Sequence, residues 1–141
     1  MQLIVGGAFA GKRKVVRSTH KKCSWVSSYN GDSLDGWKTR WDSNTTLVLE
    51  GWENWIGEEL QNELDDLIIR DRFLDVLRKL KEEEKRNETI VLIMLELGRG
   101  IVPMDQNDRR LRDLAGWLVQ DAAKISTDVH YVWHGLSRKM K

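Results

Sequence analysis

The sequence has few of the features that mark secreted, metal-stapled or membrane-spanning proteins. It contains one cysteine, Cys23, so it can form no intrachain disulfide and has no Cys/Cys or Cys/His spacing of a structural zinc site. No apolar run approaches the ~20 residues that a membrane-spanning helix needs. The apolar start, residues 1–10, is followed rather than preceded by a basic cluster, which is the wrong order for a secretory signal. We therefore expect a cytoplasmic protein without a membrane span.

The sequence also lacks an excess of charge of either sign. Its 23 Lys and Arg residues nearly balance its 22 Asp and Glu residues, which gives a net charge of +1. This balance offers no electrostatic argument for an anionic membrane or for nucleic acid, and we expect no nucleic-acid partner. There is a single proline, but seven tryptophans argue against low-complexity disorder. The length of 141 residues fits a single domain, residues 1–141.

Five short β-type runs are separated by stretches with the character of helix or loop. They are Gln2 to Val5, Ser24 to Ser27, Thr45 to Leu49, Thr89 to Leu95 and Val129 to Trp133. The first, third and fourth runs are continuously apolar, which is typical of strands covered on both faces in a parallel sheet. Helices between such strands predict an α/β domain with a mostly parallel sheet flanked by helices.

Two stretches have the three- and four-residue apolar spacing of amphipathic helices. The longer is predicted from Glu58 to about Arg86, with Asn87 as its cap, and its apolar stripe contains Leu60, Leu64, Leu67, Ile68, Leu74, Leu77 and Leu80. The second is predicted from about Asp108 to Lys124, with Leu111, Leu114, Ala115, Leu118 and Ala122 on one face. Four polar residues fall largely outside this apolar face and remain available for binding: Arg109, Arg112, Asp113 and Gln120.

The first apolar run leads directly into a glycine-rich loop that ends in a lysine. Residues 6–13 read Gly-Gly-Ala-Phe-Ala-Gly-Lys-Arg, which has the G-x-x-x-x-G-K spacing of a Walker A phosphate loop. Glycines let backbone N–H groups converge on a phosphate, and the positive end of the following helix and the lysine add charge. The alternative is a glycine-rich turn without a ligand. We predict a nucleotide-binding loop, with Lys12 also catalytic, made of Gly6, Gly7, Ala8, Phe9, Ala10, Gly11, Lys12 and Arg13.

Two residues bear on a metal ion. Arg13 stands where a Ser or Thr normally ligates the Mg²⁺ that bridges the phosphates. Because arginine contacts phosphate but cannot ligate a cation, we expect phosphate binding to be kept and Mg²⁺ binding to be weakened. Glu50, at the end of the third apolar run, stands where a Walker B acid holds Mg²⁺. We predict Glu50 as a catalytic residue and a metal ligand; the alternative is a strand that simply ends in Glu.

The segment after the fourth apolar run is the most informative part of the chain. It reads Glu-Leu-Gly-Arg-Gly-Ile-Val-Pro over residues 96–103, followed by Arg-Arg-Leu-Arg-Asp-Leu-Ala-Gly over residues 109–116. A strand that ends in a carboxylate, a turn with glycines and an arginine-bearing helix can together clamp an anion. We predict that Glu96, Arg109 and Arg112 surround a second ligand.

These residues resemble one family, the bifunctional adenosylcobinamide kinase/adenosylcobinamide-phosphate guanylyltransferase of cobalamin biosynthesis. That family looks like E-x-G-x-G-I-V-P followed by R-x-x-R-D-x-x-G-x-x-N-Q. The residues that fit are Glu96, Gly98, Gly100, Ile101, Val102, Pro103, Arg109, Arg112, Asp113, Gly116, Gln120, Val129 and Gly135, while Val119 replaces the usual Asn. The phosphate loop and Trp37-Lys38-Thr39, which is similar to the family's W-x-T, extend the resemblance over nearly the whole chain.

The resemblance implies a fold, an activity and a set of ligands. The fold is a RecA-like P-loop α/β fold, commonly assembled as a trimer, so we expect a homo-oligomer. The activity is ATP- or GTP-dependent phosphorylation of the aminopropanol hydroxyl of cobinamide, a corrinoid, and then transfer of GMP from GTP through a covalent histidine. The expected ligands are therefore ATP or GTP, Mg²⁺ and a cobinamide substrate.

One part of the family pattern is absent from this sequence. Between Trp25 and Trp37 there is no histidine, where the family carries a longer helical insert resembling R-I-x-x-H-x-x-x-R. A phosphoramidate intermediate requires an imidazole nitrogen. The three histidines of the chain lie outside this segment, and we assign none of them a catalytic role: His20, His130 and His134. We therefore expect guanylyl transfer to be lost.

Two functions remain open. The first is a member of this family that binds ATP or GTP and retains at most the kinase half-reaction. The alternative is a catalytically inactive P-loop protein that acts as a regulatory or assembly partner. Arg13, Glu50 in place of the usual Asp, and Trp41 where the family pattern expects Glu all argue against full activity.

Overall fold

Six strands form one sheet in the computed structural model, which describes residues 1–84, 88–97 and 105–141. They are β1 (Gln2–Gly6), β2 (Cys23–Ser27), β3 (Thr46–Glu50), β4 (Ile90–Leu95), β5 (Asp128–Trp133) and β6 (Leu136–Lys139), arranged in the order β2-β3-β4-β1-β5-β6. All neighbours are parallel except β6, which pairs antiparallel with β5. The predicted mostly parallel sheet and its five strands are confirmed. The exposed strand β6 is an addition that the apolar pattern does not predict.

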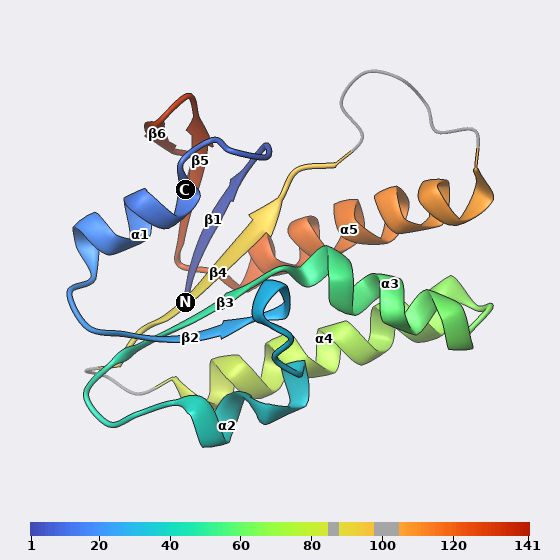
Figure 1. The fold of residues 1–141 in the computed structure, drawn as a ribbon, viewed down its shortest axis with the longest axis horizontal. Coiled ribbons are helices and arrows are strands. Elements are labelled where there is room, and N and C mark those ends of the chain that lie inside the picture. Colours follow the sequence, from blue (N-terminus) through green and yellow to red (C-terminus); the bar gives the residue numbers. More distant parts are fainter. Residues whose placement is uncertain (85–87, 98–104) are drawn as a thin grey trace.

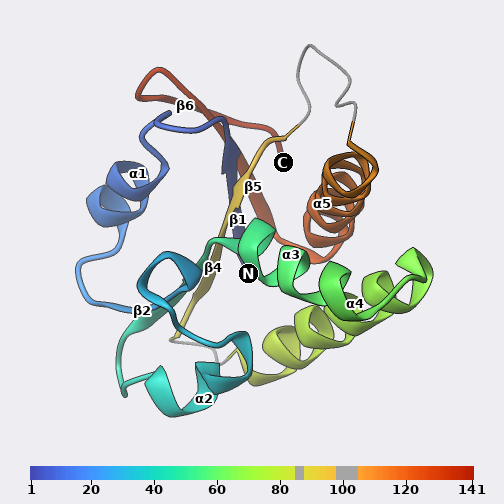
Figure 2. The same cartoon turned by 45° about the vertical axis from the view of Figure 1, so that its right-hand side comes forward.

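Helices cover both faces of this sheet, as predicted for an α/β P-loop domain. They are α1 (Lys12–Thr19), α2 (Trp37–Arg40), α3 (Trp52–Asn62), α4 (Asp66–Glu83) and α5 (Gln106–Ile125), with short 3-10 turns η1 (Ser28–Asn30) and η2 (Leu34–Gly36). Helix α1 lies on one face, and α3, α4 and α5 lie on the other (Figures 1 and 2). No helix among the described residues is long and apolar enough to cross a membrane.

The side chains of the central strands point alternately to the two faces of the sheet, so the sheet forms a middle layer with helices packed on each side. In β1, Leu3 and Val5 belong to the larger buried cluster, which also contains side chains of α3, α4 and α5, whereas Ile4 belongs to a smaller cluster with Val16 of α1. Strands β3 and β4 divide their side chains between the two clusters in the same way. Because both faces of these strands are apolar, both need a cover, as the continuous apolar runs predict.

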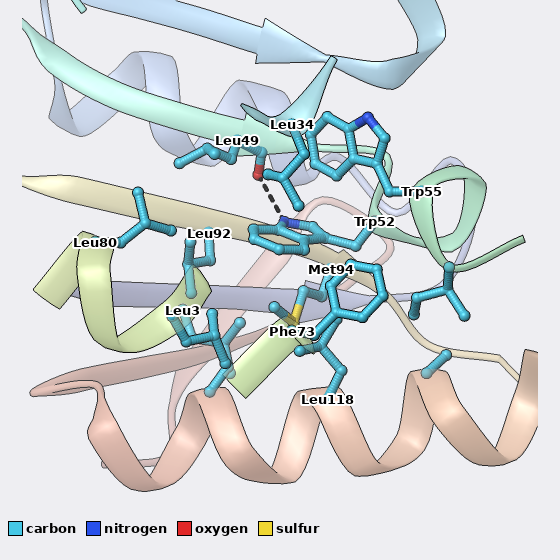
Figure 3. Close-up of a cluster of buried hydrophobic side chains, with 14 of the residues drawn as sticks. Leu3, Leu34, Leu49, Trp52, Trp55, Phe73, Leu80, Leu92, Met94 and Leu118 are labelled. Carbon is cyan, nitrogen blue, oxygen red and sulfur yellow. Dashed lines mark hydrogen bonds between the residues drawn. The ribbon is translucent and has the colours of Figure 1, made fainter. Parts of the chain in front are cut away.

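Trp52 lies inside the larger cluster, at the start of α3 (Figure 3). Its ring meets Trp55 edge-on with centroids 5.2 Å apart, and its Nε1–H donates to the carbonyl of Leu49 at 3.2 Å. This bond satisfies the indole inside an apolar environment and links the end of β3 to the beginning of α3. Trp52 and Trp55, two of the seven tryptophans, are therefore part of the core.

The prediction of one helix from Glu58 to about Arg86 is wrong, because α3 and α4 are separate helices with a break at residues 63–65. Asp65 caps α4 by accepting a hydrogen bond from the backbone N–H of Leu67 at 2.9 Å. An Asp at this position is a helix-start signal that outweighs the continuing apolar spacing. The predicted end at Arg86 and the predicted cap Asn87 lie outside the described residues.

The break also changes which side chains form the core. Leu64 is 90% exposed and Leu67 is 62% exposed, although the predicted stripe contains both. Ile69 and Phe73 of α4 are buried in the larger cluster instead. The second predicted helix is confirmed as α5, with Leu114, Ala115, Leu118 and Ala122 buried.

Candidate functional site

The predicted phosphate loop joins the carboxyl end of β1 to α1, at the edge where open α/β sheets bind their ligands. Gly11 immediately precedes α1 with a φ of 96°, a left-handed conformation that glycine adopts without a steric cost. Gly6 lies so close to β5 that an added Cβ would stand 2.4 Å from the carbonyl oxygen of Val132. At Gly7, by contrast, an added Cβ meets nothing within 4 Å.

The turn between β5 and β6 supports this loop from outside. The backbone N–H of Gly135 donates to the carbonyl of Ala10 at 2.8 Å, and Ala10 donates to the carbonyl of Gly7 at 3.4 Å. An added Cβ on Gly11 would lie 3.3 Å from the Cα of Gly135, so the two turns are in close contact. Two contacts therefore fix the loop: a hydrogen bond within it and the hydrogen bond from the β5–β6 turn.

The loop borders a cavity of about 620 Å³ at the carboxyl edge of the sheet. Its lining combines loop residues with side chains from η1, β3, α3 and β4: Ala8, Phe9, Ala10, Gly11, Lys12, Arg13, Tyr29, Glu50, Glu53, Ile93 and Leu95. The volume lies within the range of roughly 300–1,000 Å³ that is usual for small-molecule sites. The structure thus brings the predicted Lys12, Arg13 and Glu50 together, and adds Tyr29 and Glu53.

Lys12 belongs to both the loop and the cavity. Its Nζ donates to the carbonyl of Gly7 at 2.5 Å, so the ammonium lies against the loop's own backbone. Burial lowers the pKa of Lys12 below its ordinary value, and the carboxylates of Glu53 and Glu50 offset part of this effect. An incoming anion would replace the Gly7 carbonyl as the partner of this ammonium.

Arg13 and Glu50 form a two-pronged ion pair inside the cavity. The Arg13 Nε donates to Glu50 Oε2 at 2.8 Å, and Nη2 donates to Oε1 at 2.5 Å. The Glu50 side chain is 4% exposed and the Arg13 side chain 48%. The hydrogen bonding that Arg13 donates to Glu50 raises the pKa of Arg13 further above its already high value. Both carboxylate oxygens of the predicted metal ligand are therefore occupied by a guanidinium.

Tyr29 and Glu53 line the same cavity next to Arg13. The Tyr29 hydroxyl donates to Glu53 Oε1, and the tyrosine ring lies under the Arg13 guanidinium, 5.8 Å from its central carbon. Burial and the bond to Glu53 raise the pKa of Tyr29 well above its usual value, so the phenol stays protonated. Neither residue belongs to a motif that predicts a site, although residues 29–36 are rich in turn-forming residues and Glu53 follows Glu50 closely.

The residues predicted for a second ligand do not line this cavity. Glu96 follows β4 and accepts a hydrogen bond from the Tyr131 hydroxyl at 2.5 Å. Arg109 is exposed in the first turn of α5, and Arg112 pairs with its neighbour Asp113. The predicted motif residues Gly98, Gly100, Ile101, Val102 and Pro103 lie outside the described residues.

None of the three histidines lines the cavity. His20 follows α1 at the amino edge of the sheet, where its ring nitrogens contact Gln2 Oε1 at 2.9 Å and Thr46 Oγ1 at 3.3 Å. Burial lowers the pKa of His20. His130 lies in β5, and His134 lies in the β5–β6 turn with its ring 4.6 Å from that of Trp133.

Comparison with known proteins gives one family. A family model described as cobinamide kinase / cobinamide phosphate guanyltransferase matches residues 19–140. No curated protein matches the chain. The matched range includes Glu50, Glu96 and the arginines of α5, and it begins after the phosphate loop. The loop geometry and the family match are therefore separate observations.

Proposed function

The chain belongs to the cobinamide kinase / cobinamide phosphate guanyltransferase family, and from this premise we propose that it binds ATP or GTP in the cavity beside the phosphate loop. The family acts in cobalamin biosynthesis, with nucleotide and cobinamide as its substrates. The proposal assigns the kinase half-reaction, at most, to this chain. It treats residues 1–141 as one nucleotide-binding domain.

The observation that carries this proposal is the order of strand, glycine loop and lysine on the wall of a cavity. Gly6 ends β1, Gly11 precedes α1, and Lys12 opens the helix. The N-terminus of α1 and the backbone N–H groups of residues 6–13 would bind the phosphates, with Lys12 neutralising the terminal ones. A catalytic role for Lys12 is part of the proposal because phosphoryl transfer depends on positioning and charge stabilisation.

The cobinamide substrate would approach from the same edge of the sheet. Strand β4 ends next to Glu96, and the chain returns to the sheet through α5, which carries Arg109 and Arg112 in its first two turns. In parallel sheets the carboxyl ends of the strands share one edge, so these residues and the phosphate loop lie on the same side of the protein. We propose them for the second ligand on this ground and on the family pattern.

The proposal excludes guanylyl transfer by the family's histidine route. The described histidines stand outside the cavity, and residues 26–36 form the end of β2, η1 and η2 without an imidazole. A nucleophile must lie within reach of the α-phosphorus. Incubation with α-labelled GTP and Mg²⁺ should leave no label after alkaline denaturation. An acid-labile GMP adduct on any histidine would restore the guanylyltransferase reaction.

One observation favours the alternative of a protein that binds nucleotide without turning it over. The Arg13–Glu50 ion pair occupies the carboxylate that would assist a metal ion, and metal-assisted transfer is the ordinary route of P-loop enzymes. A turnover assay with adenosylcobinamide separates the two functions. A homo-oligomer, such as the trimer that the resemblance implies, and a cytoplasmic location complete the proposal; light scattering tests the first and fractionation the second.

Thermal unfolding tests the binding proposal directly. Millimolar ATP or GTP should raise the melting temperature, because a ligand that binds only the folded state stabilises it by RT ln(1 + [L]/Kd). Lys12→Ala should remove most of this shift. Lys14→Ala is the matched control, since Lys14 is an exposed neighbour in the same helix and does not line the cavity. The proposal fails if neither nucleotide shifts the melting temperature of the parent protein.

A further inference from the structure

The ion pair between Arg13 and Glu50 raises the question of what occupies the cation position of this phosphate loop. In ordinary P-loops a Ser or Thr after the lysine and an acid from a neighbouring strand hold Mg²⁺ against the phosphates. Here the residue after Lys12 is Arg13, whose side chain has N–H donors and no acceptor. One of the two usual protein contacts of the metal is therefore absent from the chain.

The second contact, the strand acid, is present but occupied. Glu50 ends β3 and uses both carboxylate oxygens to accept hydrogen bonds from Arg13, at 2.8 and 2.5 Å. Glu53, the other carboxylate that lines the cavity, accepts a hydrogen bond from the hydroxyl of Tyr29. Across residues 1–84, 88–97 and 105–141, no group of three or more His, Cys, Asp or Glu is arranged to hold a metal ion. The residues of this cavity do not fit a protein-held Mg²⁺.

The ion pair should also persist when a ligand arrives. The Glu50 side chain is 4% exposed, and a buried carboxylate without a partner is strongly unfavourable. If Arg13 swung away to a phosphate, Glu50 would lose both of its hydrogen bonds. The guanidinium, in contrast, has more N–H donors than Glu50 uses, and the Arg13 side chain lines the cavity and is 48% exposed. Arg13 can therefore contact a phosphate while it remains bound to Glu50.

Tyr29 restricts Arg13 from a second side. Its ring lies 5.8 Å from the central carbon of the guanidinium, and its hydroxyl is tied to Glu53 of α3. The guanidinium is thus oriented by a carboxylate from β3 and by a ring from η1, before any ligand binds. A charge that is oriented in advance stabilises a bound anion without a cost of reorganisation.

We propose that Arg13, fixed by Glu50 and Tyr29, supplies at this phosphate loop the positive charge that a bound divalent cation supplies in other loops, so that a nucleoside triphosphate binds without Mg²⁺. The proposal rests on the nucleotide binding proposed above and adds that this binding does not require a divalent cation. Arg13 is then a positioning residue for the phosphates, and Glu50 positions Arg13 rather than a metal.

Titration of a fluorescent ATP analogue in EDTA and in millimolar Mg²⁺ tests this proposal on the parent protein. We expect the two dissociation constants to agree within about threefold, because a guanidinium held by the protein needs no metal. A loss of affinity of about tenfold or more in EDTA would overturn the proposal, since a metal would then be required. Absence of binding in both buffers would instead contradict the proposed nucleotide site itself.

Variants locate the effect in Arg13. The double variant Arg13→Ser with Glu50→Gln removes both charges, so no buried carboxylate is left without a partner. We expect its affinity in EDTA to fall about tenfold, the scale of one charge-assisted phosphate contact. Arg17→Ser is the matched control, because Arg17 lies in the same helix over the ring of Trp25 and outside the cavity. Equal affinities of the double variant and the parent protein in EDTA would overturn the role of Arg13.

Discussion

The two edges of the sheet each carry a hollow, and the two hollows use their polar groups differently. At the carboxyl edge, about 620 Å³ is bordered by Lys12, Arg13 and Glu50, which come from a loop, a helix and a strand. At the amino edge, about 500 Å³ is bordered by Gln2, His20 and other polar residues.

The contacts at the amino edge join segments of the protein to one another. His20 connects Gln2 of β1 to Thr46 of β3, and Glu84 accepts the backbone N–H of Ile90 at the start of β4. The charged groups of the carboxyl edge surround an open cavity and retain donors toward it. We infer that the carboxyl-edge cavity is the binding site, because Lys12 and Arg13 bring N–H donors to it beside the phosphate loop. We expect substitutions at the carboxyl edge to affect binding and substitutions at the amino edge to affect stability.

The largest expected effect is at Gly6, where the carboxyl edge is also structural. Gly6→Ala places a Cβ 2.4 Å from the carbonyl oxygen of Val132, and neighbouring strands cannot separate without losing their hydrogen bonds. We expect the free energy of unfolding, measured by urea denaturation, to fall by about 3 kcal/mol.

Gly7→Ala is the matched control for this substitution, because its Cβ meets nothing within 4 Å. We expect Gly7→Ala to keep the stability of the parent protein and to weaken nucleotide binding, since its Cβ would enter the phosphate cradle. Equal losses of stability in the two variants would contradict the packing that we describe for Gly6.

A smaller effect is expected at the amino edge, from His20→Ala. The substitution removes the contacts to Gln2 and Thr46, and we expect the free energy of unfolding to fall by about 1–2 kcal/mol. Nucleotide affinity should not change, because His20 does not line the carboxyl-edge cavity. Lys21→Ala, an exposed neighbour, serves as control. A change in affinity with unchanged stability would reverse the assignment of the two edges.

The smallest effect concerns the pH dependence of His20. Burial lowers its pKa in the folded protein below the ordinary value of 6.5, so the unfolded chain takes up the proton first as the pH falls. The stabilisation by His20 is therefore complete above about pH 6.5 and decreases below it. The difference in unfolding free energy between the parent protein and His20→Ala should be smaller at about pH 5.5 than at about pH 7.5. A difference that grows on acidification would contradict this sign.

Sequence patterns predicted the regular part of the fold because periodicity reports burial. The continuous apolar runs of β1, β3 and β4 are covered on both faces, and the stripe of α5 is buried. Apolar spacing does not report the break at residues 63–65, because the spacing continues through it and a single capping residue, Asp65, begins the next helix. Nor does it report β6, because the four residues of this strand are all exposed.

The sequence predicted individual residues of the site but not the contacts between them. Arg13 was assigned to phosphate and Glu50 to a metal ion, although the two side chains bind each other across 37 positions of sequence. Their contact depends on the strand order, which places β4 between β1 and β3, and no local pattern encodes that order. Tyr29 and Glu53 escaped prediction for the same reason, because their meeting depends on how η1 and α3 pack.

Hydrogen exchange of backbone amides, with and without saturating ATP or GTP, tests the central claim most directly because it compares both edges in one experiment. We expect the nucleotide to slow exchange in residues 6–13, where backbone N–H groups would bind the phosphates, and to leave residues 20–23 and 127–128 at the amino edge unchanged. Protection at the amino edge, or unchanged exchange in residues 6–13 at saturating nucleotide, would contradict the assignment of the carboxyl-edge cavity as the nucleotide site.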